Sequence, residues 1–250
     1  MKFGKRLKQQ VQETLPDWRD KFLSYKELKK LVRLISSAPP FLNGSSEYGK
    51  SEAEFVRLLN SEIDKFNAFF MEQEEDFIIR HEALKQRIQK VIDTWGATAS
   101  QPSEAEYKEQ MGKIRKDIVN LHGEMVLLEN YSNINYTGLA KILKKYDKRT
   151  GGLLRLAFIQ KVLEEPFFIT DLVSKLVFPA EEEEKENEGR ETITVAGKGI
   201  LRNAIAALMT MKEIRRGSST YSHFSLPPLN LTESDLIPSF QLNSPISVVR

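Results

Sequence analysis

Apolar residues recur every three, four or seven positions between residues 55 and 95, and this spacing predicts one long α-helix. At 1.5 Å per residue the helix is roughly 65 Å long. Its apolar seam consists of Phe55, Leu59, Ile63, Phe66, Phe70, Phe77, Leu84, Ile88, Val91 and Trp95. A seam of this kind is typical of a helix that packs along a second helix.

A second seam follows a polar break at residues 96–103. Its members alternate at intervals of four and three residues: Tyr107, Met111, Ile114, Ile118, Leu121, Met125 and Leu128. Two such helices joined by a short polar loop form an antiparallel hairpin. Asn130 to Asn135 are rich in turn-forming residues, so we predict a turn there. A further helix is expected from Tyr136 to about Arg149, where Gly151 and Gly152 stop it.

The N-terminal segment predicts a shorter pair of helices. Residues 2–14 have the pattern of a basic helix that ends before Pro16. A second helix is expected to begin near Asp17 and to run to about Ile35, ahead of a loop that contains two prolines. We expect this short hairpin to pack on the long one.

The character of the chain changes after residue 178. Residues 153–177 are apolar and helical, with an interruption near Pro166, whereas 181–191 carry seven acidic residues against two basic ones. One more amphipathic helix is expected at 199–215, followed by a flexible Ser/Pro-rich tail. We therefore predict an all-α helical bundle over residues 1–178, with an acidic linker, a short helix and a partly disordered tail over 179–250.

Composition excludes several kinds of chemistry. The 250 residues contain no cysteine and three histidines, and the histidines lack the spacing of a zinc-binding motif. The chain has no phosphate-binding glycine loop and no run of about 18 apolar residues that would span a membrane. We expect an intracellular protein that is not an enzyme and has no cofactor or metal.

The net charge of +2 conceals strong segregation of charge. Residues 1–33 carry ten basic and four acidic residues, and residues 141–161 carry seven basic residues and one acidic residue, a net of +6 in each segment. The spacing i, i+3, i+4 and i+7 places four lysines within an arc of about 100° on one helix: Lys141, Lys144, Lys145 and Lys148. Such stacked like charges destabilise an isolated helix, and on spacing alone they fit either a solvated face or a face that binds an anionic partner.

A second basic face contains a tyrosine. Tyr25 and Lys29 are one turn apart on the second predicted helix, and Lys2 lies on the first. A phenol donates a neutral hydrogen bond to a phosphate oxygen, and lysine suits a ligand with many phosphates in varied orientations. If these residues meet Lys145, about six cations converge, which a compact polyanion would neutralise better than one inorganic phosphate.

Two other functions use the same features. The basic face could bind a nucleic acid, although few of its cations are arginines and the apolar seams occupy most of the aromatic residues. The long hairpin could instead serve as a structural or dimerisation scaffold. Competition between DNA and a compact polyanion tests the first function, and the mass in solution tests the second.

Three segments resemble the conserved blocks of SPX domains, in the same order and over residues 1 to about 175. The segments read MKFGK at 1–5, WRDKFLSYKELKK at 18–30 and NINYTGLAKILKKYDKRTG at 133–151. The later segment RNAIAALMTMKEIRRGSSTYSHFSLPP, at 202–228, is similar to the tail of the stand-alone SPX proteins of plants.

The resemblance implies an intracellular sensor of phosphate status that binds inositol hexakisphosphate or an inositol pyrophosphate. By position in the motifs, the phosphate-binding residues would be Tyr25, Lys29 and Lys145. Lys2, Lys141, Lys144 and Lys148 would flank them. The resemblance also implies that the liganded protein binds and inhibits a MYB coiled-coil transcription factor of the phosphate-starvation response, in nucleus and cytoplasm. We expect a monomer or a swapped dimer, with no direct binding to nucleic acid or membrane.

Overall fold

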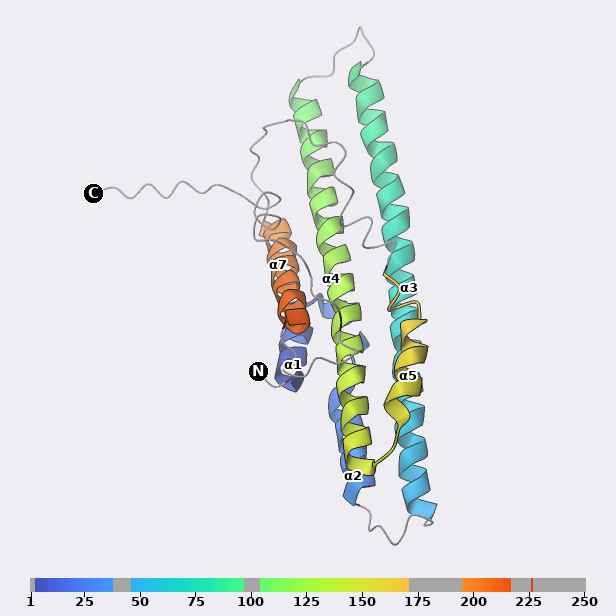
Figure 1. Ribbon diagram of the computed structural model, residues 1–250. Helices are drawn as coiled ribbons and strands as arrows, with labels where there is room; N and C mark the ends of the chain where they lie inside the picture. Colours follow the sequence, from blue (N-terminus) through green and yellow to red (C-terminus); the bar gives the residue numbers. More distant parts are fainter. Residues whose placement is uncertain (1–2, 38–45, 97–103, 171–194, 217–225, 227–250) are drawn as a thin grey trace, which may run out of the picture.

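A computed structural model describes residues 3–37, 46–96, 104–170, 195–216 and 226. Every regular element in this part of the chain is helical, which confirms the predicted all-α bundle (Figure 1). The elements are α1 (Phe3–Glu13), the 3₁₀ helix η1 (Pro16–Lys21), α2 (Tyr25–Ser37), α3 (Ser46–Gly96), α4 (Glu104–Thr150), α5 (Leu154–Leu163) and α7 (Val195–Arg216). Within the described ranges, no helix has the length and apolar character needed to cross a membrane.

The long hairpin is confirmed: α3 and α4 lie side by side and form the axis of the molecule (Figure 1). Most of the described seam of α3 is buried, and Phe66 and Phe69 of this helix pack edge-to-face against the fully buried Tyr131. The phenol of Tyr131 donates a hydrogen bond to the carbonyl oxygen of Lys21 at 3.1 Å, so the centre of the core also fixes η1. Tyr107, near the start of α4, is exposed, unlike the other described members of its seam.

The predicted turn at Asn130–Asn135 is wrong, because α4 continues through it as one helix to Thr150. The three asparagines are buried and their side chains bond to other parts of the bundle. Asn130 Nδ2 donates to Gln10 Oε1 at 2.8 Å, and Asn135 Oδ1 accepts from the amide of Leu23 at 3.0 Å. Tertiary partners thus replace the local bonds that make asparagine a turn former.

The second predicted helix is also wrong at its start. Residues 16–21 form η1, the chain is extended at Phe22, and α2 begins only at Tyr25. Trp18 and Phe22 are buried edge-to-face against Phe69 and Tyr131, respectively. The break between η1 and α2 lets Trp18, Phe22 and α2 all pack on the long hairpin. One continuous helix from residue 17 would not place all three there.

Two further helices pack on the hairpin. Asp147 accepts the amides of Leu154 and Arg155 at 3.0 and 3.3 Å and so caps α5, after a turn at Gly151, whose φ is 73°. The predicted helix at 199–215 is confirmed as α7, which lies along α4 beside α1 and buries Ala204, Ala207, Leu208 and Met211.

One amide joins three of these helices. Gln10 Nε2 donates to Thr210 Oγ1 at 2.9 Å, and its Oε1 accepts from Asn130, so α1, α7 and α4 meet there. The division at residue 178 lies outside the described residues and stays a prediction, as does the flexible tail at 217–250, of which the structure describes residue 226 alone.

Candidate functional site

Three consecutive residues, Phe22, Leu23 and Ser24, form the turn that leads into α2. We call them the entry turn. The amide of Ser24 donates to Glu62 Oε2 at 2.8 Å and its hydroxyl donates to Glu62 Oε1 at 3.0 Å. Glu62 is 5% exposed, so this carboxylate is a buried anchor from α3. Its position determines where α2 begins.

The other two residues of the entry turn are held in the same way. Lys65 Nζ donates to the carbonyl oxygen of Phe22 at 3.0 Å and to both carboxylate oxygens of Glu62. The amide of Leu23 donates to Asn135 of α4. The long hairpin therefore fixes each backbone position immediately before Tyr25, the first residue of α2.

Aromatic rings and lysines meet where α1, α2 and α4 come together. The rings of Phe3 and Tyr25 pack edge-to-face, with centroids 5.0 Å apart. Lys141 Nζ lies 5.9 Å from the centroid of Phe3, and Lys145 Nζ lies 6.0 Å from that of Tyr25. Each ammonium is within the range of a cation–π contact. Two of the predicted site residues, Tyr25 and Lys145, are thus in direct contact.

A glycine makes this close approach possible. A Cβ atom at Gly138 would lie 3.2 Å from Cζ of Phe3 and would overlap a methyl group of Leu23. Any larger residue at this point of α4 would push α1 and the entry turn away. Because Gly138 has no side chain, Phe3 and Tyr25 can approach Lys141 and Lys145.

The charges that lower the pKa values of two lysines show which cations lie near each other. Burial and the charges of Lys29, Arg149 and Arg33 lower the pKa of Lys145. Burial and the charges of Lys144 and Arg6 lower the pKa of Lys141.

Burial raises the pKa of Tyr25, so its phenol is neutral and able to donate a hydrogen bond at pH 7. We call Tyr25, Lys29, Lys141, Lys144 and Lys145 the lysine cluster.

Of the two remaining predicted site residues, one lies at the edge of the lysine cluster. Lys148 is exposed on the last turn of α4, one turn beyond Lys144. Lys2 lies outside the described residues.

The site residues predicted from sequence did not include Phe3 or three arginines: Arg6, Arg33 and Arg149. The repeat of cations at i and i+4, from Lys29 to Arg33 and from Lys145 to Arg149, is the signal that could have found two of them.

The only acidic residue among positions 141–149 does not neutralise the lysine cluster. Asp147 directs both carboxylate oxygens to the amides that begin α5. Glu213 of α7 forms an ion pair with Arg6, at the α1 side of the cluster. Within the described residues no three metal-ligating side chains gather. The arrangement, a neutral phenol among several ammonium groups, is suited to a polyanion that carries several phosphates.

Comparison with known proteins gives consistent similarities. The model of the SPX domain family matches residues 1–41 and 93–162. The chain is 58% identical to SPX domain-containing protein 3 of Arabidopsis thaliana, over 99% of this chain and 100% of that protein. It is 53% identical to SPX domain-containing protein 3 of Oryza sativa subsp. indica, over 96% and 93%, respectively.

Two more similarities were found. SPX domain-containing protein 1 of Arabidopsis thaliana is 50% identical to the chain, over 94% of each. Among solved structures, the SPX domain of Chaetomium thermophilum glycerophosphodiester phosphodiesterase 1, in complex with inositol hexakisphosphate, aligns with a TM-score of 0.49 and 26% identity. The alignment covers 71% of this chain and 93% of that one.

Proposed function

The chain belongs to the family of plant SPX domain-containing proteins, and from this premise we propose that it senses phosphate status by binding an inositol polyphosphate or pyrophosphate at the lysine cluster. It acts as a binding protein rather than an enzyme. The observation that carries the proposal is the meeting of Tyr25 and Lys145 beside Lys29 and Lys141, at the junction of three helices.

The ligand relieves charge repulsion within the cluster. Six charge-assisted hydrogen bonds of about 1–1.5 kcal/mol each give roughly 6–9 kcal/mol before ordering costs. This corresponds to dissociation constants from tens of micromolar to below one micromolar. Because Lys141 faces Phe3 of α1 and Lys145 faces Tyr25 of α2, the bound polyanion also ties α1 and α2 to α4.

The proposal extends to a partner. The liganded surface of α1, α2 and α4 binds a MYB coiled-coil transcription factor of the phosphate-starvation response and keeps it from DNA, in nucleus and cytoplasm. Gel filtration of the protein with such a factor, with and without inositol hexakisphosphate, tests this step: we expect a complex only with the ligand. A fluorescent fusion tests the localisation.

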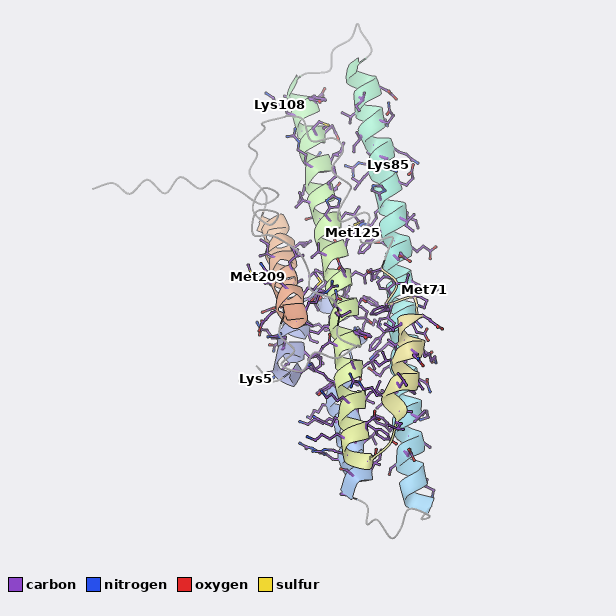
Figure 2. The ribbon with its side chains drawn as sticks, viewed as in Figure 1. Lys5, Met71, Lys85, Lys108, Met125 and Met209 are labelled. Atoms are coloured by element: carbon purple, nitrogen blue, oxygen red, sulfur yellow. The ribbon has the colours of Figure 1, made fainter. Side chains whose placement is uncertain are left out.

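Calorimetric titration of the full chain with inositol hexakisphosphate tests the binding step, with inorganic phosphate as the comparison ligand. We expect micromolar or tighter binding that weakens with salt, and a loss of at least about tenfold in Lys29→Ala/Lys145→Ala. The matched control is Lys85→Ala/Lys113→Ala, which removes two exposed lysines from α3 and α4. Lys85 lies on the upper half of α3, far from the cluster (Figure 2). Equal affinity in both double variants would contradict the site.

A further inference from the structure

Three large apolar side chains are exposed together on α3. Met71 is 52% exposed, Ile78 48% and Ile79 60%. By helical geometry they lie within an arc of about 100° and a length of about 12 Å. Phe77 is buried, and Figure 2 shows Met71 on the side of α3 that faces away from α4. Single exposed apolar residues are common on proteins, whereas a group of them on one face indicates an interaction surface.

The same stretch of α3 is strongly acidic. Residues 71–82 contain five acidic residues and one arginine. Glu72 and Glu75 are exposed, and within the described ranges neither forms an ion pair with a lysine or arginine. Elsewhere on the hairpin the acids find partners on their own helix, as where Glu109 pairs with Lys113 at 2.7 Å. Two carboxylates on this stretch are therefore available to an external cation.

The sequence puts apolar residues where the partner cations would stand. On a solvated helix, a lysine or arginine three or four residues after a glutamate pairs with it. For Glu75 those two positions are Ile78 and Ile79. We call Met71, Glu72, Glu75, Ile78 and Ile79 the acidic apolar face. It combines apolar contact area with uncompensated negative charge.

This combination fits one kind of partner. An amphipathic helix presents apolar residues at i, i+3, i+4 and i+7 and can lay that stripe along an apolar surface. Lysines beside the stripe cover apolar surface with their aliphatic stems while their ammonium groups reach carboxylates. A helix with an apolar stripe flanked by lysine or arginine therefore satisfies both halves of the acidic apolar face.

Charge complementarity favours such a helix over two other occupants. A second copy in a symmetric contact would place Glu72 and Glu75 against the same carboxylates of the other copy, and like charges oppose that contact. Residues 181–191 of the same chain carry seven acidic residues against two basic ones, so they are not complementary either.

We propose that the acidic apolar face is a docking surface for a basic amphipathic helix of another protein. This interaction goes beyond the proposed function and does not depend on it. The lysine cluster belongs to α2 and α4, whereas the acidic apolar face belongs to α3. The protein therefore offers surfaces of opposite charge, one for an anion and one for a basic helix.

Methyl NMR of the full chain, with labelled methionine methyl groups and no inositol phosphate, tests the surface. The probe is a synthetic leucine–lysine peptide with leucine at the helical spacing, and the comparison is a scrambled peptide of the same composition. We expect the helical peptide to shift the methyl signal of Met71. Met209, which is 59% exposed on α7, should keep its signal position (Figure 2). Equal shifts of both methionines would overturn the proposal.

Fluorescence anisotropy of the labelled peptide separates the apolar and the acidic contributions. We expect Ile78→Ser/Ile79→Ser and Glu72→Gln/Glu75→Gln each to weaken the affinity by at least about tenfold. All four side chains are exposed, so the variants should keep the fold. If only the Gln variant weakens binding, the peptide is attracted by charge alone and the docking surface is wrong.

Two matched controls remove the same chemistry elsewhere. Ile92→Ser/Leu153→Ser replaces two exposed apolar residues, and Asp93→Asn/Glu109→Gln replaces two exposed acids. Both controls should keep the peptide affinity within about twofold. Losses as large as those in the test variants would contradict the proposal. A dimer of the wild-type protein in sedimentation that Ile78→Ser/Ile79→Ser abolishes would also contradict it, because the occupant would then be a second copy.

Discussion

The carboxylate of Glu62, on α3, accepts hydrogen bonds from both the amide and the hydroxyl of Ser24, the residue before Tyr25. A buried acid 38 positions away along the chain thus determines where α2 starts and where the phenol of the candidate site lies. The same carboxylate holds Lys65, which bonds to the carbonyl of Phe22.

Substitution of this acid should weaken both the fold and the site. For Glu62→Gln we expect the free energy of unfolding to fall by about 1–3 kcal/mol, because the amide keeps only one acceptor oxygen for the donors of Ser24 and Lys65 and loses the negative charge that pairs with Lys65. Urea denaturation measures the loss. Glu82→Gln, at an exposed position of α3 where the pair with Lys85 is 3.8 Å long, should change stability by less than about 0.5 kcal/mol.

Coupling to the site gives a second readout. If Glu62 acts through Tyr25, Glu62→Gln should lower the affinity for inositol hexakisphosphate in the wild-type background and have little effect in Tyr25→Phe. Additive effects in the double variant would show that the two residues act independently.

The close approach at Gly138 predicts a strong dependence on side-chain size. Gly138→Ala should destabilise the protein by about 1–3 kcal/mol, because the added methyl group meets Phe3 and Leu23. The control is Gly49→Ala on α3, where a Cβ meets nothing within 4 Å and the better helix propensity of alanine should stabilise by about 0.5–1 kcal/mol. Thermal or urea unfolding of the two variants should therefore show shifts of opposite sign.

Two methionines of α7 test whether that helix is part of the packed bundle. Met211 is fully buried, whereas Met209 is 59% exposed on the side of α7 that faces away from α4 (Figure 2). We expect Met211→Ala to cost about 2–5 kcal/mol of stability and Met209→Ala to cost less than about 0.5 kcal/mol. Equal effects of the two substitutions would mean that α7 does not contribute its buried face to the stability of the bundle.

The crowding of positive charge predicts a pH dependence. The pKa of Lys145 is lowered below 10.5 in the folded protein, by burial first and then by Lys29, Arg149 and Arg33. The unfolded chain therefore binds more protons between the lowered pKa and 10.5, and the free energy of unfolding should rise with pH through this interval.

Lys145→Met should remove part of this rise and should stabilise the unliganded protein at pH 7. Urea denaturation at several pH values between 7 and 10.5 measures both effects. Lys116→Met, at an exposed position of α4, is the control. The burial of Tyr25 raises its pKa and acts in the opposite direction above pH 10, so the comparison between variants, which share this tyrosine, isolates the lysine.

The long hairpin could be predicted because its seams are local patterns that repeat over many turns. The turn at Asn130–Asn135 was predicted wrongly because its asparagines are bonded to residues more than 100 positions away, such as Gln10 and Leu23. The start of α2 was missed for the same reason, since Glu62 fixes it from another helix.

Much of the site was accessible from sequence because it lies on two regular helices. The spacing of Lys141, Lys144 and Lys145 indicated one face, and the tyrosine indicated another. Only the structure shows that Lys145 lies over the ring of Tyr25. The register between α2 and α4 cannot be read from the sequence of either helix alone. Phe3 was missed because an apolar residue near the N-terminus carries no sign that its ring will face a lysine.

The side chain of Gln10 has a consequence for the order in which the protein forms. Its amide bonds to Thr210 and to Asn130, which lie 200 and 120 positions further along the chain. During synthesis α1 leaves the ribosome first, but it acquires its contact with α7 only after residue 210 has been made. Contacts of such high sequence separation carry a large loop-closure entropy and form late in folding. Helix α1, which brings Phe3 to the candidate site, is therefore among the first parts of the protein to be synthesised and among the last to reach its native position.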